Sequence, residues 1–242
     1  WNCDSGGDDW TEEVQLTKQA VQAINKLQPR PRFLMLFLDF FKCGSFHFSG
    51  CPFREEQVKD LKEGLRGSDP DIPLVFVSGK HDLGNTPTPE SLTGAMITSV
   101  FGWFFFDSSG CPELMEADEV WLGSQLQRAI QTPSRHVLVF QHIPLFLHTP
   151  DEEDDYFNLQ RGIRERLIQR FKQQVRRKVK AVFYGHYHRN AGCCYDGLDM
   201  VVSSAVGCPL GDDTHDDVIH RYHSLDQLTK RGMDEDLKKL LV

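Results

Sequence analysis

Four short apolar segments, each followed closely by histidine or aspartate, constrain the fold of this chain more than any other feature. They cover residues 33–38, 72–77, 137–140 and 179–184, and a fifth, more mixed segment covers residues 200–205. Apolar runs of about five residues are typical of strands buried inside a sheet. The sequence therefore predicts a set of short interior strands.

Segments with helical periodicity lie between the apolar runs. In residues 9–27 apolar side chains recur at helical spacing, and Asp9 followed by Glu12 resembles a capping box. Pro29 and Pro31 then end this helix, because proline disfavours helical continuation. Further helices are expected over residues 55–65, 117–129, 159–177 and 226–241. Strands that alternate with helices predict a layered α/β fold.

The apolar segments end in residue types that bind metal ions. These residues are Asp39, His81 with Asp82, His142, and His186 with His188. In α/β sheets ligands bind outside the carboxyl ends of the strands, so these side chains are expected to converge. An extended backbone would place His186 and His188 on the same side, and Gly185 permits a close turn before them. Imidazole and carboxylate groups suit zinc, iron or manganese.

The residues at these strand ends resemble the signature of the calcineurin-like metallophosphoesterases. The matching elements are Asp39, Gly79-Lys80-His81-Asp82, His142 and Gly185-His186-Tyr187-His188. The resemblance covers most of the chain, with interruptions. It implies a two-layered β-sheet sandwich flanked by helices, with two divalent metal ions at the strand ends. It also implies phosphoester hydrolysis of the Ser/Thr protein phosphatase type, with a phosphorylated substrate such as a phosphoprotein.

The resemblance further implies which residues hold the metal ions. Asp39 would bridge the two ions. His142 and His186 would bind the second ion, and His188 would bind the first. A metal-activated water would attack phosphorus in line, because two close cations stabilise both the attacking and the leaving oxygens.

Catalytic and substrate-binding roles are implied in the same way. His81 would protonate the leaving oxygen as a general acid. Asp82 would orient His81 and raise its basicity. Arg189 and Asn190 follow the last motif directly and are candidate substrate-binding residues.

Three departures from the family pattern lower the activity expected of this chain. No Asp-x-His or Asp-x-Gln motif, which supplies the first metal ion in the family, ends an apolar run upstream of Asp39. Lys80 replaces the family's asparagine at the second metal ion, and a lysine ammonium has no acceptor atom. Leu38 replaces a glycine and is expected to crowd the loop. We therefore expect one tightly bound metal ion rather than two, held by Asp39, His142 and His186.

The chain of 242 residues is long enough for one domain with a sizeable core, expected over residues 1–242. That domain is expected to be truncated at its N-terminus, because the chain begins at Trp1 and lacks the opening motif. It also looks short around residues 102–111 and after Gly211, where the family has further strands. The sandwich is therefore expected to be incomplete.

Composition and charge exclude several classes of partner. A net charge of -8 argues against nucleic acid, whose phosphate backbone requires a basic surface. No apolar run is long enough to span a membrane. The seven irregularly spaced cysteines predict free thiols in a reducing compartment, which favours the cytoplasm. The acidic stretch at residues 151–155 is expected to be a solvated loop.

Two alternatives to an active phosphatase stay open. Lys80 and the absent opening motif favour a catalytically impaired isoform or fragment that acts as a binding scaffold. A nonenzymatic α/β protein with purely structural histidines is the second alternative, since a fold alone does not establish a function.

Overall fold

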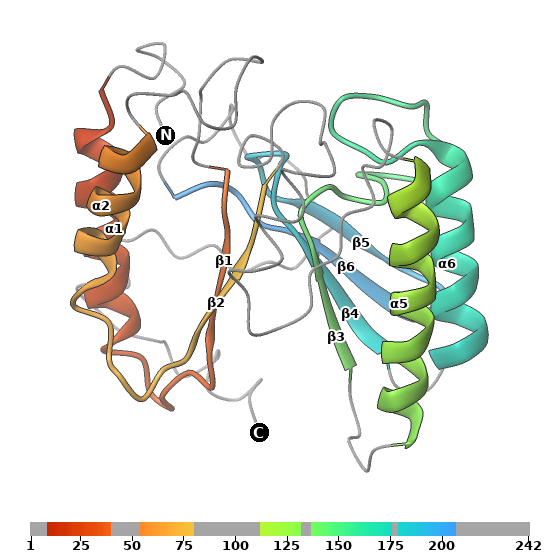
Figure 1. Cartoon of the computed structure of the whole chain (residues 1–242), viewed down its shortest axis with the longest axis horizontal. Coiled ribbons are helices and arrows are strands. Elements are labelled where there is room, and N and C mark those ends of the chain that lie inside the picture. Colours follow the sequence, from red (N-terminus) through yellow and green to blue (C-terminus); the bar gives the residue numbers. More distant parts are fainter. Residues whose placement is uncertain (1–8, 40–53, 80–111, 132–136, 176–178, 207–242) are drawn as a thin grey trace.

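In a computed structural model, which describes residues 9–39, 54–79, 112–131, 137–175 and 179–206, two β-sheets lie between two pairs of helices (Figure 1). The elements are α1 (Thr11–Ile24), β1 (Leu34–Phe37), α2 (Arg54–Leu65), β2 (Leu74–Val77), α5 (Pro112–Gln131), β3 (Val137–Gln141), α6 (Arg161–Val175), β4 (Val179–Tyr184), β5 (Ala191–Tyr195) and β6 (Leu198–Val202). The predicted α/β fold, a two-layered sheet sandwich flanked by helices, is confirmed.

The smaller sheet pairs β1 with β2 in parallel, and α1 and α2 lie on its outer side (Figure 1). Trp10 joins the two helices, because its indole Nε1 donates a hydrogen bond of 2.8 Å to Oδ2 of Asp60. The predicted capping box is wrong. Trp10 is the N-cap residue, and the Asp9 carboxylate accepts a hydrogen bond of 2.9 Å from the backbone N–H of Thr11.

The larger sheet has the strand order β3-β4-β6-β5. Strands β3, β4 and β6 run parallel, whereas β5 pairs antiparallel with β6. The apolar pattern did not predict β5. Its hairpin turn at Asp196 and Gly197 has φ angles of 54° and 78°, the left-handed conformation for which the Asp-Gly pair is a strong signal. Cys193 and Cys194 on β5 are free thiols, as predicted.

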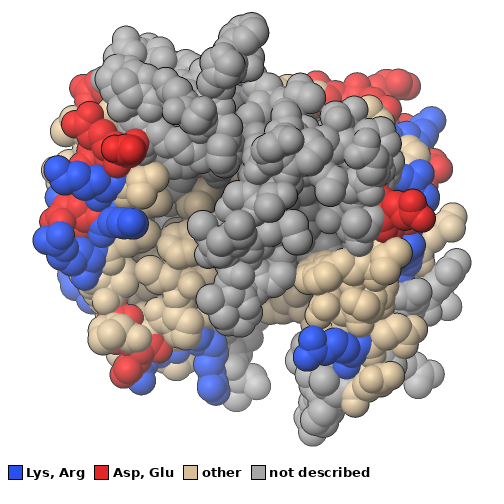
Figure 2. Space-filling model, in the orientation of Figure 1, with Lys and Arg blue, Asp and Glu red and all other residues tan. Residues whose placement is uncertain are grey.

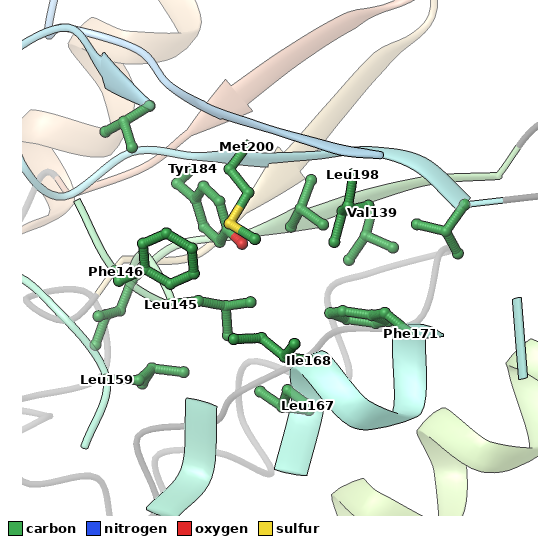
Figure 3. Packing of buried hydrophobic residues seen from close by; sticks show 14 of the residues in the cluster. Val139, Leu145, Phe146, Leu159, Leu167, Ile168, Phe171, Tyr184, Leu198 and Met200 are labelled. Atoms are coloured by element: carbon green, nitrogen blue, oxygen red, sulfur yellow. The ribbon is translucent and has the colours of Figure 1, made fainter. Parts of the chain in front are cut away.

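A continuous apolar core fills the space between the larger sheet and α6 (Figure 3). Strand residues Val182 and Met200 are at most 1% exposed, and Phe171 of α6 is 3% exposed. Burying a side chain of this size stabilises a fold by about 1.5–3 kcal/mol. The core therefore holds β3, β4 and α6 together as one unit. Charged side chains gather instead on the surface of the outer helices (Figure 2).

Most predicted element positions are confirmed within a few residues. The helix expected over residues 117–129 is longer and spans Pro112–Gln131, whereas β6 begins two residues before the apolar run assigned to it. The helix expected at 226–241, and the regions around 102–111 and after Gly211, lie outside the described residues. No helix in the described ranges has the length and apolar character needed to cross a membrane.

Candidate metal centre

Three predicted ligands converge where β1, β3 and β4 end. Potential ligand atoms of Asp39, His142 and His186 all lie within 4.8 Å of one another. Both histidines are 4% exposed, and the Asp39 side chain is 12% exposed. A buried group of one carboxylate and two imidazoles is a donor set that suits zinc, iron or manganese.

His188 approaches the same carboxylate from another direction. Oδ2 of Asp39 lies 3.7 Å from Nε2 of His142 and also 3.7 Å from Nε2 of His188. These separations are longer than an N–H···O hydrogen bond. An ion about 2.1 Å from two tetrahedral ligands holds them about 3.4 Å apart, close to the observed spacing. The carboxylate thus lies between two imidazoles at a distance that accommodates a cation.

The hydrogen bonding of His142 provides a direct test of this fit. Its Nδ1 and Nε2 atoms are both buried, and neither forms a hydrogen bond in the described part of the structure. Buried polar atoms are nearly always partnered, because desolvation without a partner is costly. A metal ion beside Asp39 would give Nε2 of His142 its missing partner, so the residues present fit a bound divalent metal ion.

Two glycines allow the strand ends to approach each other closely. A Cβ atom on Gly79 would lie 2.0 Å from the carbonyl oxygen of Leu38 and 2.6 Å from Oδ1 of Asp39. A Cβ atom on Gly185 would lie 2.9 Å from Cβ of Phe37. Any side chain at either position would therefore push the ligands apart.

The backbone around the last histidine pair is not extended, so that prediction was wrong. His186 and His188 have φ angles of 63° and 55°, and the Tyr187 N–H donates to the Gly185 carbonyl at 2.7 Å. Residues other than glycine seldom adopt this left-handed conformation, and such strain concentrates at functional sites. The resulting turn nevertheless brings both imidazoles toward Asp39.

The backbone of Leu38 takes part in the site, whereas the loop that its side chain is expected to crowd continues outside the described residues. Its backbone N–H donates a hydrogen bond of 2.7 Å to the Val77 carbonyl, which continues the pairing of β1 with β2. Its own carbonyl oxygen is the atom closest to the position of a Cβ on Gly79. The backbone of Leu38 therefore extends the strand pairing and lies close to Gly79 beside Asp39.

The two candidate substrate-binding residues differ in their surroundings. The Arg189 guanidinium lies 5.0 Å from the ring centre of Tyr187 and 6.0 Å from that of Phe157. Asn190 instead accepts a hydrogen bond of 3.0 Å at Oδ1 from the N–H of Ser204. Asn190 therefore ties the motif to the segment after β6, whereas Arg189 places a positive charge on an aromatic surface. Lys80, His81 and Asp82 lie outside the described residues.

Tyr156 is a neighbour of the site that the sequence did not reveal. Its carbonyl oxygen lies 2.9 Å from Nε2 of His186, and its ring lies 5.0 Å from the His186 ring. Burial, and next the negative charge of Asp39, raise the pKa of the Tyr156 phenol, so its hydroxyl stays protonated at neutral pH. No residue-type pattern predicts a contact made by a backbone carbonyl.

The acidic stretch at residues 151–155 is a loop in which every residue except the half-buried Glu152 is exposed, so the predicted solvated loop is confirmed, but it also makes specific polar contacts. The Glu152 carboxylate accepts hydrogen bonds from three backbone N–H groups and from the Asn158 side chain. Asp154 pairs with the fully buried Arg164 at 3.2 Å. The loop between β3 and α6 therefore has a fixed polar interior.

A cavity of about 270 Å³ extends from the ligands along β1. Its walls are β1, the facing sides of α1 and α2, and the segment after β6. The lining includes Ala20 of α1, Leu36 of β1 and Leu61 of α2. The packing on this side of the site is consequently looser than on the α6 side.

An α/β sandwich with an aspartate-histidine cluster at its strand ends is the arrangement expected of a calcineurin-like phosphoesterase. No protein-family model matches the chain. The whole chain is 67% identical to serine/threonine-protein phosphatase CPPED1 of Danio rerio and covers 84% of that protein. It is 48% identical to the protein of that name in Rattus norvegicus, with 99% of the chain aligned to 83% of the relative. For the Homo sapiens protein the identity is 46%, over 99% of the chain and 82% of the relative.

Identity of this extent shows the family. The chain belongs to the CPPED1 (calcineurin-like phosphoesterase domain-containing protein 1) family of serine/threonine-protein phosphatases. The resemblance stated from the strand-end motifs is confirmed.

Proposed function

We propose that this chain is a metal-dependent phosphoester hydrolase that acts on phosphorylated serine or threonine in proteins. The observation that carries the proposal is the buried group of Asp39, His142 and His186, whose ligand atoms lie within 4.8 Å of one another. The relatives, named serine/threonine-protein phosphatases, support the substrate class.

The protein residues would divide the work as follows. Asp39, His142 and His186 would hold one divalent ion, and His188 shares the Asp39 carboxylate. When bound, such an ion supplies Lewis-acid activation of the phosphoryl group and of water. His81 would donate a proton to the leaving serine or threonine oxygen, with Asp82 orienting its imidazole. One ion is expected to bind more tightly than any second, since His188 and Asp39 alone form a weak set.

Arg189 is the residue we propose for binding the substrate phosphate. It follows the ligand His188 directly, and its guanidinium contacts the rings of Tyr187 and Phe157. A guanidinium fixed on aromatic rings loses less freedom when it binds phosphate oxygens, for which its N–H geometry is well matched. Asn190 is proposed in a supporting role, because Oδ1 already accepts a hydrogen bond from Ser204.

The test combines metal content with hydrolysis of an aryl phosphate and a phosphoserine peptide in the presence of manganese. His142→Ala and His186→Ala should each lower the bound metal and abolish hydrolysis, because each removes one ligand. His148→Ala is the matched control, since it also removes a histidine but from an exposed position outside the ligand group. If His186→Ala retains hydrolysis, the assignment of the site is wrong.

A catalytically weakened binding protein is the second candidate, and Lys80 is the observation that favours it. An ammonium group beside the metal would repel the cation and offers no acceptor atom. Lys80→Asn should therefore raise hydrolysis with manganese. Unchanged activity in a folded Lys80→Asn variant would show that Lys80 is not the obstacle.

A further inference from the structure

The loop between β3 and α6 packs against the proposed metal ligand His186. Its Nε2 atom lies 2.9 Å from the carbonyl oxygen of Tyr156. The rings of Tyr156 and Phe157 lie 5.0 Å and 5.8 Å from its own ring centre, and the side chain is almost completely buried. The orientation of the imidazole is therefore set by this loop as well as by β4, which ends two residues before His186.

The contact with Tyr156 also determines which nitrogen of His186 carries the proton. A carbonyl oxygen can only accept, so a hydrogen bond at this distance requires a proton on Nε2. The neutral imidazole then has its lone pair on Nδ1, the nitrogen through which a metal ion can be bound. A carbonyl that fixes the tautomer of a ligating histidine is a common outer contact of metal sites.

The carboxylate of Glu152 organises the loop that carries this carbonyl. Oε1 accepts from the N–H of Leu147 at 2.9 Å, and Oε2 accepts from the N–H groups of His148 and Thr149 at 2.9 and 3.2 Å. Hydrogen bonds from backbone N–H groups to a carboxylate are stronger than those between neutral groups, so three of them hold these residues in one arrangement. Glu152 thereby fixes the first part of the loop, a few residues after β3 and His142.

Asn158 connects that first part to Tyr156. Its Nδ2 group donates to Oε1 of Glu152 at 2.7 Å and to the Glu153 carbonyl at 2.9 Å. Its Oδ1 accepts from the N–H of Asp155 at 2.8 Å, immediately before Tyr156. The amide of Asn158, two residues after Tyr156, thus uses both of its ends to hold the segment that leads up to the carbonyl facing His186.

The loop is also anchored to the packed half of the molecule. The fully buried Arg164 of α6 donates a hydrogen bond to the Glu152 carbonyl and another, at 3.2 Å, to Asp154. The Leu159 N–H donates to the Pro144 carbonyl at 2.9 Å and closes the base of the loop. Movements of the loop are therefore restricted at three points.

We infer that Glu152 and Asn158 are positioning residues for the metal site: they hold the Tyr156 carbonyl on Nε2 of His186 and so present Nδ1 to the metal ion. This inference rests on the proposed metal-dependent function. The position of the proton on His186 can nevertheless be measured in the metal-free protein. Neither residue touches the ligand atoms, and the acidic loop acquires a specific role.

Glu152→Gln separates the hydrogen-bonding role of the Glu152 carboxylate from the effect of its side-chain size. It preserves shape, but one carboxylate oxygen becomes an NH₂ group that faces N–H donors, so two of the four hydrogen bonds to the side chain are lost. Loss of an outer contact typically lowers metal affinity about 10- to 100-fold. Glu153→Gln is the matched control, since it makes the same change at an exposed neighbour in the same loop.

Two measurements test the inference. Long-range ¹H–¹⁵N NMR of the metal-free protein should show the His186 proton on Nε2 in the native chain and in Glu153→Gln. In Glu152→Gln it should be shared between Nε2 and Nδ1, while the His142 signals stay unchanged. Calorimetric titration with Zn²⁺ alone should give an affinity about 10-fold weaker for Glu152→Gln.

The outcomes separate the inference from the proposed function. A native His186 protonated on Nδ1, or an unchanged tautomer and Zn²⁺ affinity in Glu152→Gln, would overturn the inference. A native chain that binds no Zn²⁺ would overturn the proposed metal site, yet the metal-free NMR spectra would still decide the tautomer. If Glu152→Gln does not fold, Asn158→Ala takes its place, because it breaks the connection to Tyr156 without changing the charge.

Discussion

The ends of the four-stranded sheet and of the two-stranded sheet bring proposed metal ligands into the same cluster, but the two sheets are packed very differently. The residues of the main apolar core all lie between Leu122 and Val202, in the larger sheet, its helices and the loop between β3 and α6. In the smaller sheet all four residues of β1 are half-buried, Phe33 beside it is 38% exposed, and the cavity runs along the strand. His142 and His186 thus rest on a dense support, whereas Asp39 rests on a looser one.

The looser half has a few buried apolar side chains, such as Val21 and Ile72, and is also held by polar contacts and backbone pairing. Trp10 bonds to Asp60 between the two helices, and Asn25 accepts from the Asp69 N–H at 3.0 Å while donating to the Gly67 carbonyl. Such contacts contribute about 1 kcal/mol each, less than a buried aromatic side chain. This difference in packing between the two halves indicates that the proposed ligands of one site need not be held equally rigidly.

The largest effect is expected from truncating a core aromatic residue. Phe171→Ala should lower the free energy of unfolding by about 3–5 kcal/mol, because it removes a fully buried ring from the packed half. Leu36→Ala in β1 should cost less than half as much, since Leu36 is half-buried and already borders the cavity. Denaturant unfolding measures both, with exposed Val120→Ala as the neutral control. Equal losses for Phe171 and Leu36 would remove the contrast between the halves.

One enlargement, made in both halves, should have opposite signs. Ala191→Leu in β5 should destabilise the protein by about 1–3 kcal/mol, because the site is 3% exposed and overpacking forces strain. Ala20→Leu in α1 should stabilise it by about 0.5–1 kcal/mol, because the new side chain enters the cavity. Thermal unfolding of the two variants checks the signs. A loss of stability in Ala20→Leu would mean that the space beside β1 cannot accept a side chain.

A smaller and local effect is expected between α1 and α2. Trp10→Phe removes the indole donor to Asp60 and should cost about 1 kcal/mol. Hydrogen exchange should accelerate in α1 while the amides of α6 keep their protection, because the two helices belong to different halves. Asp60→Asn keeps an acceptor oxygen and should give a weaker effect. Faster exchange in α6 as well would indicate that the halves unfold together.

The smallest effect is a dependence of the β3–α6 loop on pH. Burial opposes ionisation of Glu152, but hydrogen bonds from the Leu147 backbone, the Asn158 side chain and two further N–H groups hold its pKa below the usual 4.5. A carboxylate with a lowered folded pKa stabilises the fold fully above its unfolded pKa, and that stability is lost as pH falls through the folded value. Protection of the Leu147 amide should therefore persist at pH 5 and decline below about 4.5. Glu152→Gln should abolish this decline.

The sequence predicted the strands that carry the ligands better than it predicted how the ligands are held. Continuous apolar runs mark β1 to β4, because strands buried in a sheet need no polar face. Strand β5 was not predicted, because Gly192, Cys193 and Cys194 form no apolar run. The Asp196-Gly197 pair was nevertheless a signal for its turn.

The features of the site that were not predicted have a shared physical cause. The acidic stretch is largely exposed as expected, but the hydrogen bonds of Glu152 were not predicted, because its partners, backbone N–H groups and Asn158, have no signature in residue type. The left-handed turn at His186 follows Gly185, which lies close to Phe37 of the other sheet, and periodicity reports neither feature. Long-range backbone contacts therefore limit what a single sequence can reveal about a site.

The close approach at Gly79 and Gly185 has a consequence for reading mutational data. Neither residue offers a ligand atom, but a methyl group on either would collide with the Leu38 carbonyl or with Phe37. In a saturation library both positions should tolerate substitution as poorly as Asp39 or His186. Such data would thus place Gly79 and Gly185 in the same class as the proposed metal ligands. Only a metal-binding assay on folded variants would distinguish the two glycines from the ligands.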